Sequence, residues 1–260
     1  MKLSIIIPAY NEEKRIGRTL DAYSSFFDKI YEKNKLDYEI LVVINGTIDK
    51  TEEVVKSFQK KNKKISYLNF KMGGKGFAII EGFKDSLKRK NNLIGYVDAD
   101  MATPPKSFYD LVLEINNFDG SIASRYVAGS EIYPKISFRR TLVSRVFNLL
   151  VRTLFYIRYK DTQCGAKLFT RNAIERVLPL LGMTGWAFDI ELLYLLKKNN
   201  LKAKEVKTIW REIEGTHINI LKSTIQMIFA VIQLRIVNSK LQGLLKPVRG
   251  IIGFLWRLIK

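Results

Sequence analysis

The stretch Leu93-Ile94-Gly95-Tyr96-Val97-Asp98-Ala99-Asp100 joins a short apolar run to two closely spaced carboxylates. Such a run is typical of a buried strand, so both acids are expected to emerge together at its carboxyl end. Oxygen ligands grouped in this way suit Mg²⁺ or Mn²⁺, and an ion held by one or two carboxylates commonly takes its other ligands from substrate phosphates. An Asp-X-Asp triplet also arises by chance or as a helix cap, so taken alone it leaves both interpretations open.

Apolar β-rich runs alternate with amphipathic segments around this stretch. The expected strands cover residues 3–7, 38–44, 65–70, 93–97 and 121–124. The expected helices cover residues 12–31, 50–61, 75–90 and 105–117. This alternation is typical of parallel strands joined by crossover helices, in which ligands gather at the carboxyl ends of the strands. The sequence therefore predicts an α/β fold with a mostly parallel central sheet flanked by helices.

The second half of the chain has a looser pattern. A loop is expected at 128–135, an apolar helix at 139–156 and a strand within 201–213, and two helical stretches follow from residue 219. We expect a catalytic domain over residues 1–218 and amphipathic C-terminal helices over residues 219–260.

The C-terminal stretches are amphipathic and partly basic. In 243–260, Phe254 and Trp256 accompany an apolar stripe and basic side chains, which suits a helix lying in a bilayer interface. For 219–238, packing on the domain core or on a dimer partner is the favoured alternative. Because no segment offers the roughly 20 apolar residues that a spanning helix needs, contact with a membrane is expected at its surface.

The composition is strongly basic. The chain has 260 residues, with 44 Lys and Arg against 25 Asp and Glu and a formal net charge of +19. This charge favours anionic partners, namely phosphates, acidic lipid surfaces or nucleic acid. Cys164 is the only cysteine, which excludes an intrachain disulfide or a cysteine metal cluster. The apolar stretch 3–7 is interrupted by Pro8 and is too short for a signal peptide, so a cytoplasmic location is expected.

Four segments occur in an order that resembles family 2 glycosyltransferases with the GT-A fold. They are Pro8-Ala9-Tyr10-Asn11-Glu12, Gly73-Gly74-Lys75-Gly76, Asp98-Ala99-Asp100 and Ser124-Arg125-Tyr126. Three later segments, at 161–171, 186–194 and 210–215, are similar to the dolichyl-phosphate β-glucosyltransferase branch, whose near relatives are the dolichyl-phosphate mannose synthases. The resemblance extends over nearly all of residues 3–235.

The resemblance implies inverting transfer of a hexose from a nucleoside diphosphate sugar to dolichyl phosphate or another polyprenyl phosphate lipid. It implies a peripheral enzyme on the cytoplasmic face of a membrane surface, with no nucleic acid as partner. Glucose from UDP-glucose is favoured over mannose from GDP-mannose. Because a phosphomonoester has a second pKa of about 6, such an acceptor is already nucleophilic near neutral pH and needs no general base.

Two other interpretations stay open at this point. The same fold acting on a hydroxyl acceptor would need a positioned base. A non-catalytic basic module that binds nucleic acid or an anionic membrane would leave the acid pair unexplained.

The resemblance also implies which residues bind the donor. They are Pro8, Tyr10, Glu12, Asn45, Lys75 and Asp98. Asp98, Asp100 and Lys75 are expected to be catalytic: the acids hold Mg²⁺ or Mn²⁺, and Lys75 adds positive charge at a helix start beside the departing diphosphate. His217 is a further candidate metal ligand, because Ala102 stands where mannose-transferring relatives often have a polar ligand.

On the acceptor side, the lipid phosphate is expected to bind Arg125, Arg139, Arg140 and Ser144. The planar fork of arginine binds phosphate oxygens through two hydrogen bonds, and four-residue spacing places Arg140 and Ser144 on one helix face. Four nearby polar residues are expected to order the acceptor loop or the core rather than to act as bases: Asp161, Gln163, Asp189 and Glu191.

Overall fold

A computed structural model describes residues 1–134, 138–182, 185, 187–212 and 220–239. Its strands are β1 (Lys2–Ala9), β2 (Asp37–Asn45), β3 (Ile65–Phe70), β4 (Leu93–Tyr96), β5 (Gly120–Ser124), β6 (Glu131–Tyr133), β7 (Lys167–Thr170), β8 (Ala203–Lys207) and β9 (Ile209–Arg211). Its helices are α1 (Ile16–Glu32), α2 (Thr51–Lys61), α3 (Lys75–Lys88), α4 (Pro105–Glu114), α5 (Phe138–Phe155), α6 (Arg171–Val177), α7 (Phe188–Lys198) and α8 (Ile220–Val237), with a short 3₁₀ turn η1 (Leu178–Leu180).

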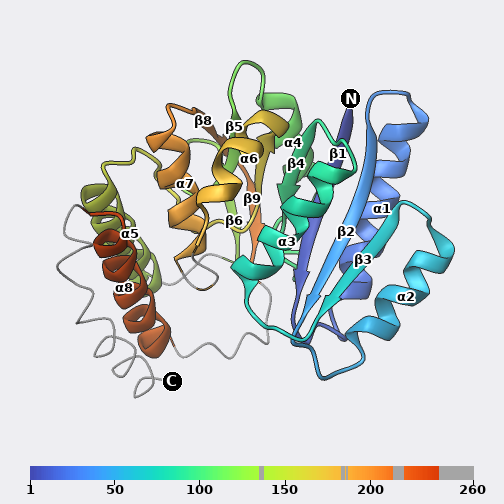
Figure 1. Cartoon of the computed structure of the whole chain (residues 1–260), viewed down its shortest axis with the longest axis horizontal. Helices are drawn as coiled ribbons and strands as arrows, with labels where there is room; N and C mark the ends of the chain where they lie inside the picture. Colours follow the sequence, from blue (N-terminus) through green and yellow to red (C-terminus); the bar gives the residue numbers. More distant parts are fainter. Residues whose placement is uncertain (135–137, 183–184, 186, 213–219, 240–260) are drawn as a thin grey trace.

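The central sheet has seven strands in the order β3-β2-β1-β4-β7-β5-β8. The strands are parallel except for β7, which runs antiparallel to both β4 and β5. A separate two-stranded sheet pairs β6 with β9. The prediction of a mostly parallel α/β sheet flanked by helices is confirmed (Figure 1).

Two hydrophobic cores lie on opposite faces of this sheet. Ile5 and Ile7 of β1 pack into the core that α1, α2 and α4 cover, whereas Ile6 packs into the core beneath α3, α6 and α7. A strand buried on both faces reads as a continuous apolar run, which is why β1 and β2 are recognisable from sequence. Gly82 lets α3 approach β1 closely, because a Cβ at that position would lie 2.6 Å from Cγ2 of Ile6.

The first 125 residues form the predicted elements, although α1 begins at Ile16 rather than at residue 12 and α4 ends at Glu114 rather than at residue 117. The larger differences lie downstream. The predicted loop at 128–135 contains the three-residue strand β6, and the 201–213 segment holds two strands, β8 and β9, separated at Thr208. Strand β7 was not predicted: it is four residues long and contains Lys167, whose charge hides it from a hydrophobicity pattern. The predicted helix at 139–156 is confirmed as α5.

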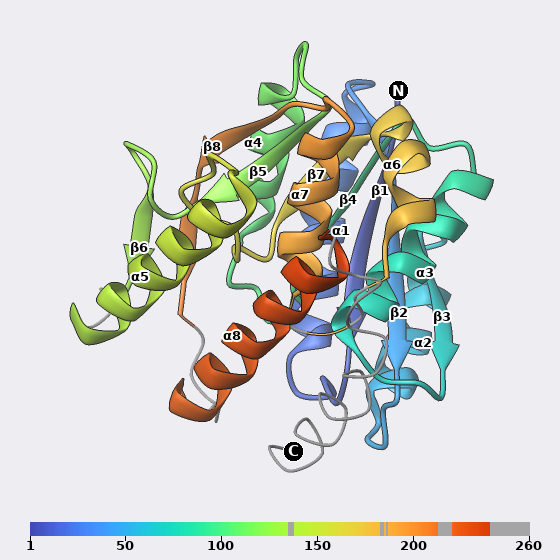
Figure 2. The same ribbon diagram turned by 60° about the vertical axis from the view of Figure 1, so that its left-hand side comes forward.

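Helix α8 lies beside α5 (Figures 1 and 2). Its residues Ala230, Val231 and Leu234 are buried in the core that also holds α7, so this part of the helix packs on the core. The expected role of 219–260 as membrane-surface helices stays a prediction. The predicted boundary at residue 218 stays a prediction, and the amphipathic segment 243–260 lies outside the described residues. Over the described ranges, every helix falls short of the length and apolarity that crossing a membrane requires.

Candidate active site

The loops after β1 and β2 and the loop before α3 are tied together by one buried side chain. Asn45, only 2% exposed, ends β2. Its Nδ2 donates to the carbonyl of Ala9 at 2.9 Å, and its Oδ1 accepts from the backbone N–H of Gly74 at 2.9 Å. Gly46 follows with φ +62°, and a Cβ there would lie 3.1 Å from the Cα of Gly73. Asn45, predicted to bind the donor, therefore positions the loops around the site, and a direct donor contact stays a prediction.

The predicted donor residues in the first loop have different environments. Pro8 is buried in β1, paired with Val43, whereas Tyr10 is 57% exposed. The Glu12 carboxylate accepts two hydrogen bonds from Arg15, at 2.7 and 2.8 Å. Burial, reinforced by the negative charges of Asp100 and Asp98, raises the pKa of Glu12 above its ordinary value. The negative charges of Asp98 and Asp100 therefore act on the carboxyl group of Glu12.

Asp98 and Asp100 follow β4 at the carboxyl edge, as predicted. Asp98 is about one-third exposed, and Lys75 Nζ lies 2.6 Å from its Oδ1. Asp100 Oδ1 accepts a hydrogen bond from the N–H of Ala102 at 2.9 Å. Burial and the charge of Asp98 raise the pKa of Asp100, against the opposing effects of that hydrogen bond and of Arg15. The two acids therefore repel each other, an arrangement that a bound cation relieves.

Gly165 lies directly beneath the Asp98 carboxylate. A Cβ at this position would be 1.8 Å from Asp98 Oδ2 and 2.4 Å from its Cγ. Gly165 belongs to the segment that leads into β7, so the antiparallel strand brings this backbone against the acid pair. The sequence offered only the glycine itself as a signal for this contact.

Lys75 starts α3, directly after Gly74, which has φ +131°. Its Nζ lies between Asp98 Oδ1 at 2.6 Å and Asp189 Oδ2 at 3.9 Å. Loss of solvation acts to lower the pKa of Lys75, but the two carboxylates outweigh it and raise the pKa. Lys75 therefore stays a cation at the mouth of the site. Its expected contact with the departing diphosphate stays a prediction.

The Asp189 carboxylate forms an ion pair with Lys75 on the buried side of the site. It is buried, and its Oδ1 accepts hydrogen bonds from Tyr96 Oη at 2.6 Å and from Lys167 Nζ. Lys167 has a fully buried side chain and also donates to the carbonyl of Cys164 at 2.7 Å. Burial acts to raise the pKa of Asp189, but Lys167 and Lys75 lower it overall. Negative and positive side chains thus alternate from the mouth of the site into the core, in the order Asp98, Lys75, Asp189 and Lys167.

Arg125, predicted to bind the acceptor phosphate, faces a buried acid instead. Its Nε and Nη2 donate to Asp161 at 2.7 and 2.9 Å, its backbone N–H donates to the same carboxylate at 3.0 Å, and the Asp161 side chain is fully buried. The prediction that Asp161 orders this region is supported by these contacts. In this arrangement the guanidinium of Arg125 organises the loop, and phosphate binding by Arg125 stays a prediction.

Ser144 lies near Arg125 on the acceptor side. Its hydroxyl lies 2.6 Å from the hydroxyl of Tyr126, and the guanidinium of Arg145 lies 4.3 Å from the centre of the Tyr126 ring. Arg145 was not among the predicted ligands, although it directly follows Ser144. Arg139 and Arg140 lie in the first turn of α5.

A cation site here rests on two acids. Across the described ranges, no group of three His, Cys, Asp or Glu side chains is placed to hold a metal ion. His217, the proposed further ligand, lies outside the described residues. Asp98 and Asp100 supply oxygen donors of the kind that Mg²⁺ and Mn²⁺ prefer, and such ions commonly complete their shells with water and substrate phosphates.

Comparisons with known proteins give one consistent result. The family model described as glycosyl transferase family 2 matches residues 4–178. The chain is 36% identical over 243 residues to the dolichyl-phosphate beta-glucosyltransferase of Dictyostelium discoideum, covering 90% of this chain and 73% of the relative. It is 35% identical over 237 residues to the human protein of that name, covering 87% and 72%, respectively.

Solved structures share the fold at low identity. A glucosyl-3-phosphoglycerate synthase from Mycobacterium tuberculosis, solved with Mn²⁺, uridine-diphosphate and phosphoglyceric acid, superposes with a TM-score of 0.66 at 15% identity, covering 92% of this chain and 80% of that one. A mannosyl-3-phosphoglycerate synthase from Rubrobacter xylanophilus superposes with a TM-score of 0.67 at 20% identity, covering 94% and 75%, respectively. These likenesses confirm the predicted fold.

Proposed function

The chain belongs to glycosyl transferase family 2, and from that premise we propose that it transfers glucose from UDP-glucose to the phosphate of dolichol or a similar polyprenol. The observation that carries the proposal is the similarity, over 84–90% of the chain, to relatives named dolichyl-phosphate beta-glucosyltransferase. Mannose transfer from GDP-mannose is not favoured, because these relatives are named for glucose.

A divalent cation fits the acid pair. Asp98 and Asp100 would hold it, since burial and the charge of Asp98 raise the pKa of Asp100 and the oxygens of both acids are hard ligands. When bound, such an ion acts as a Lewis acid that neutralises the departing diphosphate. The Mycobacterium tuberculosis synthase was solved in complex with Mn²⁺, which supports a divalent ion in this fold.

Lys75 stabilises the same leaving group. Its ammonium lies at the first position of α3, where the helix dipole also favours negative charge. Because its ion pair with the buried Asp189 fixes its position, the Lys75 ammonium is pre-positioned for the negative charge that develops on the diphosphate as the sugar–phosphate bond breaks.

The acceptor needs orientation rather than deprotonation. A lipid phosphate is largely dianionic near neutral pH, so one of its oxygens attacks the anomeric carbon, UDP leaves from the opposite side, and the configuration inverts. We assign its binding to the start of α5, where Arg139, Arg140 and Ser144 lie, with Arg145 added beside Ser144. Arg125 organises the adjoining loop through Asp161.

A membrane-bound acceptor also indicates the location at which the protein acts. A dolichol chain is held in a bilayer, so the enzyme is expected to act as a peripheral protein at a membrane surface. The cytoplasmic face stays an expectation.

The test is a transfer assay with purified full-length protein. UDP-glucose and GDP-mannose, each labelled in the sugar, are incubated with dolichyl phosphate and Mg²⁺ or Mn²⁺, and lipid extracts are separated by thin-layer chromatography. We expect a chelator-sensitive glucolipid from UDP-glucose, absent with Asp98→Asn. Asp110→Asn, which alters an acid on α4 paired with Lys106, is the matched control and should retain activity. Lack of lipid product with either donor would refute the proposal.

A further inference from the structure

One face of α5 is apolar and exposed. Leu142, Val146 and Leu149 are 52%, 58% and 60% exposed, and their spacing of four and three residues places them on one stripe of the helix. The opposite face buries Phe147, Val151 and Phe155 in the core, so the helix is firmly packed. We call Leu142, Val146 and Leu149 the α5 stripe.

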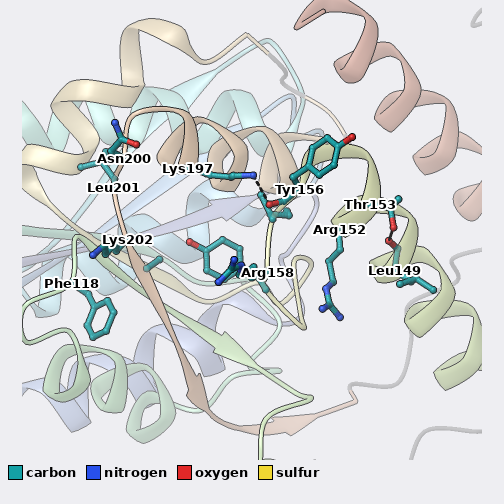
Figure 3. A pocket seen from close by; sticks show the side chains of 13 residues that line it. Phe118, Leu149, Arg152, Thr153, Tyr156, Arg158, Lys197, Asn200, Leu201 and Lys202 are labelled. Atoms are coloured by element: carbon teal, nitrogen blue, oxygen red, sulfur yellow. Dashed lines mark hydrogen bonds between the residues drawn. The ribbon is translucent and has the colours of Figure 1, made fainter.

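A pocket of about 1040 Å³ opens at the C-terminal end of this helix. Figure 3 shows its walls, which come from the end of α5, the segment that follows it, the end of α7 and the start of β8. Its cations are Arg152, Arg158, Lys197 and Lys202, and none of the described residues that line it is acidic. We call this the basic pocket.

Three of the four cations are available to a ligand. Lys197 Nζ donates to the carbonyl of Tyr156, which completes the wall where α5 ends (Figure 3). Arg152, Arg158 and Lys202 are exposed, and none of them forms an ion pair with a carboxylate within the described part of the chain. The nearby acids are engaged by backbone groups: Asp119 accepts from the N–H of Lys202, and Glu205 accepts from the N–H of Lys160.

The stripe and the pocket form one surface. Leu149 belongs to both, and Arg152 lies one turn beyond it. The 18 residues of α5 extend for about 27 Å. The helix therefore links Ser144, on the acceptor side of the candidate site, to the pocket at the amino edge of the sheet, where β5 and β8 begin.

Resting on the membrane-surface location of the proposed function, we propose that the α5 stripe and the basic pocket together dock on an anionic lipid bilayer, with the phosphate of one phospholipid held in the pocket. This lipid is distinct from the acceptor, because the pocket lies at the edge of the sheet opposite Asp98. An apolar stripe flanked by Arg145 and Arg152 suits a helix lying in the membrane interface, and the 71% exposed ring of Tyr156 suits the headgroup level.

Charge and shape together select this partner. Guanidinium groups bind phosphate oxygens through paired hydrogen bonds, and basic residues near an anionic leaflet strengthen binding. A polynucleotide would use the cations but gain nothing from the exposed Leu142, Val146 and Leu149. A bilayer uses both parts of the surface.

The test is vesicle flotation with the full chain and no nucleotide sugar, so its result is independent of the transfer assay. Vesicles are made of phosphatidylcholine alone or with phosphatidylserine. Arg152→Ala, Arg158→Ala and Lys202→Ala are combined in one variant. The matched control combines Lys60→Ala, Lys63→Ala and Lys88→Ala, which make the same charge change at exposed positions in or near α2 and α3, two helices that lie away from α5 (Figure 2).

The pocket variant should lose at least about tenfold in partition onto phosphatidylserine vesicles relative to the control, and little on phosphatidylcholine. A second variant, Leu142→Ser with Val146→Ser and Leu149→Ser, should lose binding to both kinds of vesicle. Because all of these side chains are exposed, unchanged circular dichroism and UDP binding should confirm folding. Equal partition of pocket variant and control, or loss of polynucleotide binding with vesicle binding intact, would overturn the proposal.

Discussion

Gly165 supports the carboxylate of Asp98 by having no side chain: a Cβ there would lie 1.8 Å from Asp98 Oδ2. Either the acid or the backbone must move if any side chain is added. The rotamer that points Asp98 toward Lys75 therefore depends on a residue 67 positions later in the chain.

Gly165→Ala is expected to lower kcat/KM for glucose transfer by about 100-fold, because displacement of a catalytic group by about 1 Å has effects of that size. Steady-state kinetics with UDP-glucose measure it. Gly185→Ala is the control, since a Cβ at that glycine meets no atom within 4 Å. Equal activity of the two variants would show that the Asp98 position tolerates the change.

Asp100→Asn should stabilise the cation-free protein near neutral pH. The raised pKa of Asp100 means that the folded protein holds this proton more tightly than the unfolded chain does, so ionisation above the ordinary value of 3.8 destabilises the fold. The gain should vanish below that value, where both states are protonated. Thermal unfolding at several pH values measures it.

The same variant tests metal binding without relying on activity. Added Mn²⁺ should raise the melting temperature of the unaltered protein through preferential binding to the folded state, and should raise that of Asp100→Asn much less. Asp110→Asn, on α4, should respond to Mn²⁺ as the unaltered protein does. An identical shift in all three proteins would place the cation elsewhere.

Asn45→Ala should lower the stability of the protein and weaken the binding of UDP-glucose. It leaves the N–H of Gly74 without its side-chain acceptor and removes the shorter of the two side-chain hydrogen bonds to the Ala9 carbonyl, the other coming from Thr47 Oγ1 at 3.5 Å. The expected cost is about 1–3 kcal/mol in the free energy of unfolding. Because the loop before Lys75 is then untied, KM for UDP-glucose should rise. Asn69→Ala, which removes an exposed amide paired with Glu52, is the control and should change neither quantity. A fall in stability without a change in KM would limit Asn45 to a structural role.

Asp161→Asn should be strongly destabilising. It leaves the guanidinium of Arg125, 13% exposed, without its charge partner, which costs about 3–5 kcal/mol for a buried pair. Urea unfolding measures it against Asp37→Asn, whose carboxylate is 46% exposed and pairs with Lys64; that pair is worth at most about 1 kcal/mol. Similar losses in both variants would contradict an organising role for Arg125.

The pH dependence of the Asp161 pair has a defined sign. Burial acts to raise the pKa of Asp161, but the charge and hydrogen bonds of Arg125 lower it overall. The contribution of the pair is therefore present above the ordinary pKa of 3.8 and is lost as the pH falls through the lower value of the folded protein.

The sequence was sufficient to bring Asp98, Asp100 and Lys75 to one place. The two acids follow the apolar run of β4 and Lys75 follows β3, and the carboxyl ends of parallel strands meet at one edge of a sheet. The partners of Asp98 and Lys75 from the second half of the chain were not predictable in this way. Gly165 reaches the site because β7 inserts antiparallel between β4 and β5, a pairing that no local period encodes, and Asp189 reaches it from the first turn of α7.

Arg125 shows the same limit for the acceptor side. A motif predicts the residue type, but its partner Asp161 lies 36 residues away and was expected only to order the region. Whether a guanidinium is available to a substrate depends on such long-range ion pairs, which only the folded arrangement reveals.

Variants at Asp189 can separate its effect on Lys75 from its effect on the stability of the fold. Asp189→Asn alone should be destabilising by about 3–5 kcal/mol, because the fully buried ammonium of Lys167 loses its counter-charge. Combining it with Lys167→Met removes both charges, and replacing a buried pair by apolar groups is often close to neutral, so urea unfolding should show stability largely recovered. Glucose transfer should stay impaired in kcat, since Lys75 no longer has a carboxylate beneath it. Lys167→Met with Asp189 retained is the comparison that keeps this carboxylate near Lys75. Full recovery of kcat in the double variant would show that Asp189 matters to catalysis only by keeping the protein folded.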